Sequence, residues 1–166
     1  MKNLLYAILI LPLMLSCSSA DKKAEQNIAI VEKYIQSVEN LDYQTMELLL
    51  HDDYLGMGPS YGDSINKETA LANWEYLVDN LYRSITYSRS RNVAVTINSG
   101  DNQGEWVSNW GELTIRYKNT DDAVTIWANS IYQIEDGRII KSFTFYNEAD
   151  ALRQLGYYFS KNRFIY

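Results

Sequence analysis

His51 is the single histidine of the chain, and Asp52 and Asp53 follow it directly. A histidine beside a carboxylate can act as an acid/base pair or bind a metal ion. The alternative is structural, because adjacent residues at the end of a helix point in different directions and aspartates there hydrogen-bond the local backbone. We favour the structural interpretation, and with one histidine and one cysteine in the chain we expect no metal site, no cofactor and no catalytic residue here.

Glu112 is the second residue with possible chemistry. It alternates with Trp106, Ser108, Trp110 and Thr114 along a stretch of strand-like composition. If this face of the strand points inward, a carboxylate among aromatic rings would have a raised pKa and a possible acid/base role. If the face points outward, Glu112 is solvated and the tryptophans cover the sheet surface or a partner. Alternation along a strand cannot choose between the two faces.

Aromatic side chains are the third feature, with fourteen tyrosines and four tryptophans in 166 residues. The simplest interpretation is that they fill the core. A buried tyrosine hydroxyl needs a partner, however, so inward tyrosines also suit a pocket for a flat, partly polar ligand. The rings that a fold could bring together are Trp74, Trp110, Trp127, Tyr132 and Tyr146.

Helical patterns occupy the first half of the chain. Apolar residues three and four apart between Ile28 and Val38 predict an amphipathic helix over residues 21–40, with Tyr34 beside the buried stripe. Asp42 is expected to cap a short second helix that ends at residues 51–54, and a glycine-rich loop is expected over 56–63. Asn66 is then expected to cap a third helix.

Four long strands are expected after Tyr82, because the composition becomes rich in β-branched and aromatic residues between polar turns. Their predicted ranges are 84–97, 104–117, 123–135 and 138–147. Asn147 can cap a last short helix that stops at Gly156. Residues 157–166 are expected to pack over the domain.

The turn between the last two strands reads "EDG" and fits a three-residue hairpin loop with Gly137 in the left-handed conformation. This loop would pair Ile134 with Arg138. By that register, one face of the hairpin carries both polar and apolar side chains, as the wall of a ligand cavity would. Its residues are Ser130 and Tyr132 of the first strand and Ile140, Ser142, Thr144 and Tyr146 of the second.

Helices followed by a long antiparallel sheet predict an α+β domain, with three helices on one face of a curved sheet of about four long strands and a short C-terminal helix. The chain length and a hydrophobic content of 46% fit one domain. A bent sheet wrapped around helices would leave a blind pocket.

The amino terminus has one early charge at Lys2 and an apolar run, residues 4–15, that is too short to cross a bilayer. We therefore predict a secretory signal peptide over residues 1–16. The only cysteine, Cys17, follows the apolar run and resembles the acylated cysteine of a bacterial lipobox, although Met14 stands where leucine is more usual. The alternative is a free exported thiol.

The predicted organisation is an acylated Cys17 with a tether over residues 17–24 and a single domain over 25–166. From this arrangement we expect the protein in the bacterial cell envelope, held to the outer membrane through its lipid alone. The net charge of −6 and the scattered basic residues argue against nucleic-acid binding, because phosphate binding needs clustered lysine and arginine.

Three sequence strings, in this order, carry a family resemblance: "KYIQSVENLDYQTMELLLHDDYLGMGP", "IYQIEDGRIIKSF" and "EADALRQLG". Over residues 27–156 the chain resembles the NTF2-like superfamily, in particular its SnoaL-like cyclase and ketosteroid isomerase branches. The resemblance implies an NTF2-like cone. It does not imply an activity, because this fold hosts enzymes, binding modules and assembly domains.

Within that resemblance, Tyr34 stands where the family places a tyrosine that donates to a substrate oxyanion. Gly58 stands where it has a carboxylate base, and Ser130 stands near its aspartic acid. Enolisation needs a base near the carbon acid and donors aimed at the oxyanion. Glycine cannot take a proton and a serine hydroxyl is not a base unaided, so the resemblance implies the fold without its best-known chemistry.

We therefore expect an envelope lipoprotein that binds a small aromatic or apolar molecule without catalysis. The expected ligand-binding residues are Tyr34, Trp74, Trp110, Glu112, Ser130, Tyr132 and Tyr146. One alternative is a cyclase, isomerase or hydratase-type enzyme that uses Glu112 or Asp53. The other is an interaction domain that forms a homodimer through the outer face of the sheet, with Phe143 and Phe145.

Overall fold

The structure is a computed structural model that describes residues 2–158, with the backbone alone for residues 2–19. Its four helices are α1 (Lys2–Glu39), α2 (Tyr43–Leu49), α3 (Lys67–Asn80) and α4 (Glu148–Gln154). Its six strands are β1 (Leu50–Met57), β2 (Ser64–Asn66), β3 (Tyr82–Ile97), β4 (Gly104–Tyr117), β5 (Ala123–Glu135) and β6 (Arg138–Tyr146).

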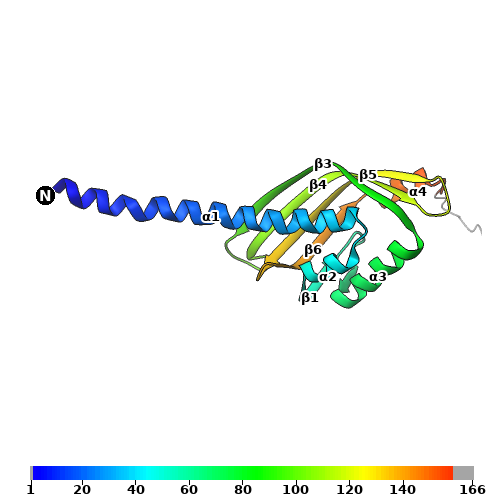
Figure 1. The fold of residues 1–166 in the computed structure, drawn as a ribbon, viewed down its shortest axis with the longest axis horizontal. Helices are drawn as coiled ribbons and strands as arrows, with labels where there is room; N and C mark the ends of the chain where they lie inside the picture. The colour runs from blue at the N-terminus through cyan, green and yellow to red at the C-terminus, as the bar shows by residue number, and fades with distance from the viewer. Residues whose placement is uncertain (1, 159–166) are drawn as a thin grey trace, which may run out of the picture.

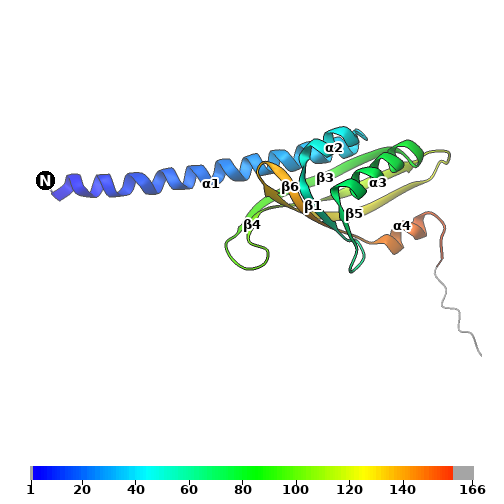
Figure 2. The ribbon, with the colours of Figure 1, turned by 90° about the horizontal axis from the view of Figure 1, so that it is seen from below.

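The strands form one curved sheet in the order β2-β1-β6-β5-β4-β3, antiparallel throughout except where β1 runs parallel to β6. Helices α1, α2 and α3 lie on one side of this sheet, which we call the concave face, and α4 lies at one end (Figures 1 and 2). The expected α+β class, with helices on one face of a curved sheet and a short last helix, is confirmed.

Two short strands, β1 and β2, were missed by the sequence analysis. Residues 51–54, expected at the end of a helix, lie within β1, and the first two residues of the expected loop 56–63, Gly56 and Met57, belong to β1 and pair with β2. The reason is tertiary: β1 gains its backbone partners from β6, which is distant in sequence, and it buries Leu50 and Tyr54 against the helices. Such a partner leaves little local signal.

The hairpin between β5 and β6 differs from the prediction by one residue. Glu135 pairs with Arg138 and Ile134 with Ile139, so the loop has two residues, Asp136 and Gly137, both with positive φ (47° and 74°). Positive φ at both positions suits the twist of a two-residue hairpin. The left-handed Gly137 is confirmed, but the three-residue loop and its pairing of Ile134 with Arg138 are wrong.

A register shift next to this turn sets the faces of β6. Ile139 rather than Ile140 is fully buried, so Ile140 does not share the expected face. Beyond the shift, Ser142 pairs with Tyr132, Thr144 with Ser130 and Tyr146 with Ala128. Because directly paired residues share a face, the hydroxyl-bearing residues of β6 stand beside Ser130 and Tyr132 as expected.

The predicted helix caps are confirmed. The side chains of Asp42, Asn66 and Asn147 each accept a hydrogen bond from the backbone N–H three residues later, at 2.9, 2.9 and 3.1 Å. These bonds satisfy amide groups that a helix start leaves without partners.

Helix α1 is longer than predicted. It begins at Lys2, and its first half extends beyond the sheet (Figure 1). The expected tether, residues 17–24, is therefore helical. Among the described residues, no helix combines the length and the apolar character needed to cross a membrane. The side chain of Cys17 and residues 159–166 lie outside what the structure describes, so acylation of Cys17 and packing of the C-terminal segment stay predictions.

A bulge in β3 bends the sheet over the helices. The β3–β4 register shifts between Ser88 and Arg91, with Arg89 at φ 54°. The buried side-chain amide of Asn109 donates to Ser90 Oγ and Asn92 Oδ1, both at 2.8 Å, and to the Arg91 carbonyl at 3.3 Å. A bulge increases the local twist and bend of a strand, so these bonds help to hold the curvature of the sheet around the helices.

Candidate functional site

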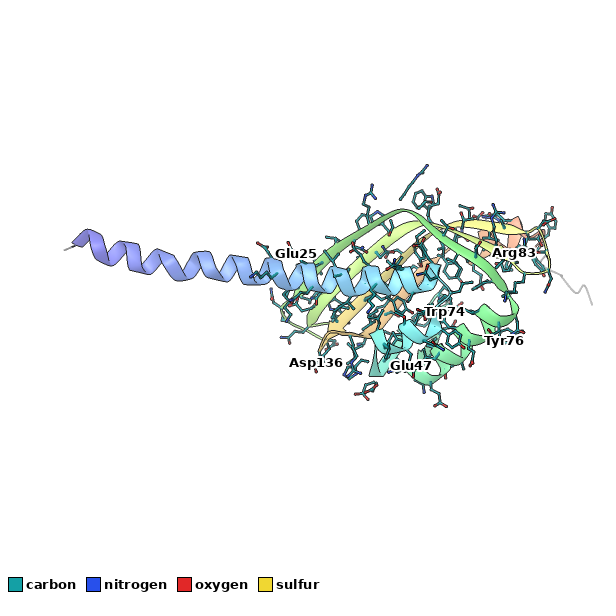
Figure 3. All side chains as sticks on the ribbon, viewed as in Figure 1. Glu25, Glu47, Trp74, Tyr76, Arg83 and Asp136 are labelled. Atoms are coloured by element: carbon teal, nitrogen blue, oxygen red, sulfur yellow. The ribbon has the colours of Figure 1, made fainter. Side chains whose placement is uncertain are left out.

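A cavity of about 370 Å³ lies between the helices and the concave face of the sheet, and we call it the concave cavity. Helices α1, α3 and α4 and strands β1, β3, β4, β5 and β6 all contribute to its wall. Figure 3 shows the side chains that fill the space between helices and sheet, with Trp74 labelled on α3. The expected pocket is therefore present.

Five of the seven expected ligand-binding residues line the concave cavity: Tyr34, Trp74, Ser130, Tyr132 and Tyr146. The other two, Trp110 and Glu112, do not. They lie on the opposite face of the sheet, the convex face, because the residues of β4 that line the cavity have the other parity: Leu113, Ile115 and Tyr117.

Glu112 has ordinary surface partners on the convex face. It accepts a hydrogen bond from Ser88 Oγ at 3.0 Å, and its other oxygen lies 3.6 Å from an Arg89 nitrogen. The outward alternative of the sequence analysis is therefore the one that the structure supports. Glu112 supplies no carboxylate to the concave cavity.

Tyrosines are the most frequent residue type in the cavity wall. The seven that line it are Tyr34, Tyr54, Tyr82, Tyr87, Tyr117, Tyr132 and Tyr146. Three of these, Tyr34, Tyr132 and Tyr146, were expected from the sequence. Tyr117 shares the parity of Leu113 on β4, and Tyr87 faces the cavity because it pairs with Leu113 from β3. Tyr54 depends on β1, which carried no recognisable signal.

Burial keeps these hydroxyls protonated. Desolvation, reinforced by neighbouring tyrosines, holds the pKa values of Tyr34 and Tyr132 well above their usual range. Burial, together with the nearby Tyr117 and Glu39 respectively, raises the pKa values of Tyr82 and Tyr87 to about 12. At neutral pH the wall therefore offers uncharged hydroxyl groups that can both donate and accept hydrogen bonds.

Two hydroxyl pairs stand on the β5–β6 side of the cavity. Tyr54 Oη lies 2.7 Å from Ser142 Oγ, and Ser130 Oγ lies 3.2 Å from Thr144 Oγ1. Deeper in the cavity, the rings of Tyr34 and Tyr132 meet edge to face with centroids 5.7 Å apart. The sequence analysis placed Ser130 in a pocket as a hydroxyl, and its position agrees.

Gly58 lines the same cavity as Tyr34 and Ser130. Its φ is +91°, and a Cβ built there would collide with the Thr144 carbonyl oxygen. Both facts exclude a side chain at this position without a backbone shift. The site that the resemblance assigns to a carboxylate base therefore cannot carry one in this backbone.

Ionisable side chains other than tyrosine are nearly missing from the wall. Among the described residues that line the cavity, Glu148 is the one carboxylate, and no lysine, arginine or histidine is present. Glu148 is exposed at the start of α4, and its charge adds to the burial that raises the pKa of Tyr146. The cavity interior can thus bind and orient a neutral molecule, but it contains no group of ordinary basicity.

The His51 cluster lies on β1 and does not line the concave cavity. Asp52 binds Lys67 at 2.9 Å and Arg138 at 3.4 Å, and His51 Nδ1 accepts a hydrogen bond from the Asp53 backbone at 3.1 Å. These contacts fit the structural interpretation. In the part of the chain that the structure describes, no three His, Cys, Asp or Glu side chains gather closely enough to hold a metal ion.

Helix α4 forms part of the cavity wall near Glu148, through Ala151, Leu152 and Leu155. It is held to the sheet by Gln154, whose Oε1 accepts from the Thr125 N–H and whose Nε2 donates to the Thr125 carbonyl, both at 2.9 Å. Thr125 lies in the part of β5 that extends beyond the end of β6. The Gln154 amide therefore takes the place of a strand residue at this edge.

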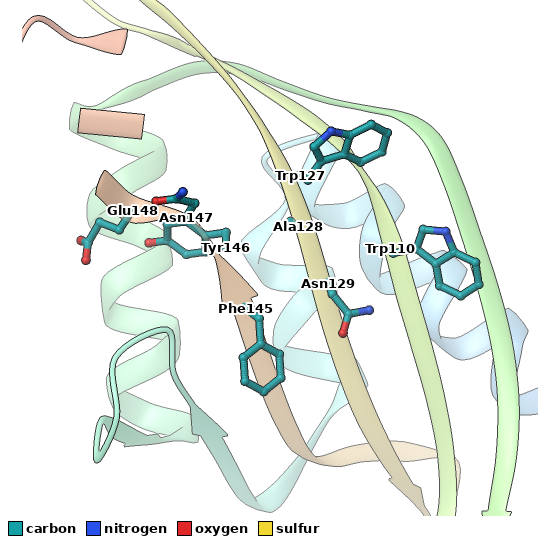
Figure 4. Close-up of a pocket in the computed structure, with 8 residues that line it drawn as sticks. All are labelled: Trp110, Trp127, Ala128, Asn129, Phe145, Tyr146, Asn147 and Glu148. Atoms are coloured by element: carbon teal, nitrogen blue, oxygen red, sulfur yellow. The ribbon is translucent and has the colours of Figure 1, made fainter. Parts of the chain in front are cut away.

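The convex face carries its own aromatic surface. Trp110, Trp127 and Phe145, on three adjacent strands, border a shallow hollow (Figure 4), and these residues are 43%, 61% and 50% exposed. A second groove of about 340 Å³ beside it is lined mainly by apolar side chains, including Val93, Val95, Trp106, Ile131 and Phe143. Helices α1, α2 and α3 lie on the other side of the sheet (Figure 2).

Comparisons with known proteins identify the fold. No protein-family model matches the sequence, and no curated protein is significantly similar to it. Solved structures do match. A candidate polyketide cyclase from Xanthomonas campestris superimposes with a TM-score of 0.66 at 13% identity, over 80% of this chain and 98% of its own. An LEH-like epoxide hydrolase from M. tuberculosis gives 0.61 at 16% identity, over 80% and 91%.

Two further structures agree with this result. An NTF2-like protein from Burkholderia xenovorans gives a TM-score of 0.61 at 15% identity over 79% of this chain and 96% of its own. A candidate SnoaL-like polyketide cyclase from Shewanella denitrificans gives 0.61 at 14% identity over 78% and 96%. Identities this low establish the fold and leave the activity open. The chain therefore has the NTF2-like fold, in the cone form that SnoaL-like proteins share.

Proposed function

We propose that the domain binds a small neutral molecule in the concave cavity and performs no acid/base reaction on it. The observation that carries this proposal is the composition of the cavity wall: seven protonated tyrosines, apolar side chains, and no interior carboxylate among the lining residues. Tyrosine rings provide apolar contact area, and their hydroxyls fix the orientation of a partly polar ligand.

The rival is an enzyme of the kind suggested by the names of the cyclase and epoxide hydrolase structures. Such chemistry needs a base within reach of the reacting atom. Gly58 and Ser130 cannot supply one, and Glu148 lies exposed at the start of α4. Ligand binding without catalysis is therefore the better supported of the two.

The binding proposal is tested first by native mass spectrometry of the mature protein purified from its own host in mild detergent. We expect an extra mass that leaves on activation in the gas phase.

In a second measurement, calorimetry with 2-naphthol should detect binding, and Ala151→Trp, which fills the cavity from α4, should abolish it. Ala149→Trp is the control because Ala149 is exposed and does not line the cavity. Binding unaffected by Ala151→Trp would contradict the proposal.

For its location, we propose that the protein is anchored in the cell envelope through an acylated Cys17. The support is the sequence alone: a short apolar run followed by the only cysteine. Radiolabelled palmitate should enter the protein in a bacterial host, and Cys17→Ser should abolish the label and release the protein from the membrane fraction. Labelling of the Cys17→Ser protein would contradict the assignment.

A second candidate role is dimerisation through the convex face. It is favoured by the uncovered aromatic surface there, since monomers rarely expose large contiguous apolar patches. Light scattering should give twice the monomer mass, and Phe145→Asp should give the monomer. Tyr76→Asp is the control, because Tyr76 is 64% exposed on α3, on the other side of the sheet. A monomeric unaltered protein would exclude this role.

A further inference from the structure

The two walls of the concave cavity differ in chemistry. Toward β6, the lining residues of that strand all carry hydroxyls: Ser142, Thr144 and Tyr146. Toward β4, the lining is mainly apolar side chains and aromatic rings: Leu113, Ile115, Ile85, Val124 and Ile126, with Tyr82, Tyr87 and Tyr117. A bound molecule would therefore meet a row of hydroxyl groups along the β6 edge and mainly apolar side chains and tyrosine rings along the other.

The hydroxyl pairs on the polar wall have hydrogens to spare. Each hydroxyl has one hydrogen to donate and can accept two. The Tyr54–Ser142 pair has two hydrogens and one bond between its members. The Ser130–Thr144 pair likewise has two hydrogens and one bond. Burial raises the pKa of the Tyr132 hydroxyl and a hydrogen bond with Ser130 opposes that rise, so Tyr132 extends this pair to three hydroxyls with three hydrogens and two bonds. Each of the two groups therefore has one hydrogen that it can donate to a ligand.

The spacing of these two donor groups is fixed by β6. Ser142 and Thr144 are two residues apart on one face of the strand, which is roughly 7 Å at the rise of an extended chain. Tyr54 reaches Ser142 from β1, and Ser130 stands opposite Thr144 on β5. Two donors about 7 Å apart therefore lie along a single wall.

Charge adds a second restriction. No lysine, arginine or histidine lines the cavity in the described residues, and Glu148 is the lining carboxylate. An anion that entered would lose its hydration and gain no counter-charge.

Resting on the proposed function, we infer that the concave cavity selects neutral, flat molecules that carry two acceptor oxygens on one edge, about 7 Å apart, bound by the Tyr54–Ser142 and Ser130–Thr144 hydroxyls. The opposite edge of such a molecule is apolar and lies against Leu113 and Ile115. Ser142 and Thr144 are then the residues that determine specificity.

Two isomers of one probe test this inference in the full-length protein. In 2,7-dihydroxynaphthalene both oxygens lie on the same edge at nearly the required separation, whereas in 2,6-dihydroxynaphthalene they lie on opposite edges. The isomers have the same size and nearly the same polarity. Calorimetry should give about fivefold tighter binding of the 2,7 isomer, since one hydrogen bond of about 1 kcal/mol separates them. The anion 2-naphthoate should not bind.

Conservative variants identify the donors. Ser142→Ala and Thr144→Val should each weaken binding of the 2,7 isomer several-fold and reduce its advantage over the 2,6 isomer. Thr114→Val is the matched control: its hydroxyl pairs with Thr125 at 3.0 Å on the convex face, outside the cavity. A far-ultraviolet circular dichroism spectrum and thermal midpoint for each variant verify that it is folded.

The outcomes separate the inference from the proposed function. Equal binding of both isomers, blocked by Ala151→Trp, would keep the binding function and overturn the selection by edge. An isomer preference that survives in both Ser142→Ala and Thr144→Val would overturn the assignment of donors. Absence of binding of either isomer and of 2-naphthol would overturn the proposed function and the inference with it.

Discussion

Gly58 is the residue whose conformation restricts the chemistry of the concave cavity most directly. Its φ of +91° and the nearby Thr144 carbonyl leave no room for a side chain. A serine at 130 instead of an acid is a change of side chain alone, whereas a glycine at 58 is also a requirement of the backbone. An acid could not be restored at position 58 by substitution alone.

Gly58→Ala should destabilise the fold by about 2 kcal/mol or more, because it combines an unfavourable φ with a steric collision. Gly62→Ala is the control, since Gly62 has nearly the same φ, +89°, but open space around its Cβ; it should cost only about 1 kcal/mol. Urea unfolding measures both. Equal losses in the two variants would show that the Thr144 contact contributes nothing.

At the scale of elements, α4 is a part of the cavity wall that is held by few buried contacts. None of its residues is buried, and the Gln154 amide supplies two bonds to β5. Elements with few buried contacts open at low free energy. This makes α4 the natural route by which a ligand would enter and leave.

Gln154→Ala should raise the hydrogen-exchange rates of the α4 amides by about tenfold, because it removes both bonds to Thr125. The amides of β4 and the urea midpoint should change little. Arg153→Ala serves as the control, since the Arg153 side chain hydrogen-bonds Asp150, within the helix. If α4 exchanges at the same rate in the Gln154→Ala protein, other contacts hold the helix in place.

For the whole molecule, the buried tyrosines link stability to alkaline pH. A folded-state pKa above the unfolded value means that the folded protein keeps its proton while the unfolded chain loses it. The contribution is complete below about pH 10, and it is lost as the pH rises toward about 12 for Tyr82 and Tyr87. Each such group can remove up to about 1.4 kcal/mol per pH unit in that window.

Tyr87→Phe should therefore make the fall in unfolding free energy between pH 9 and pH 11 less steep, as measured by urea unfolding at each pH. Tyr61→Phe is the control, because Tyr61 is fully exposed and lies outside the cavity. Parallel curves for the unaltered and Tyr87→Phe proteins would show that Tyr87 ionises in the folded protein.

Much of the fold could be predicted from local patterns. The bounds of β4 and β5 agree with their predicted ranges, and Asp42, Asn66 and Asn147 cap the helices that they were expected to cap. These features depend on neighbours in the sequence: a capping side chain bonds an amide three residues away, and strand composition favours extended backbone whatever its partner.

Local composition and periodicity were enough to predict the α+β class and the order of the long elements, and residue identity alone shows that positions 58 and 130 carry no acid. The folded chain was needed to show that Glu112 and Trp110 face outward, that β1 brings Tyr54 to Ser142, and that seven tyrosines meet in one cavity. Alternation along a strand is symmetric between its two faces. Which face is buried depends on where the helices pack and on partners distant in sequence.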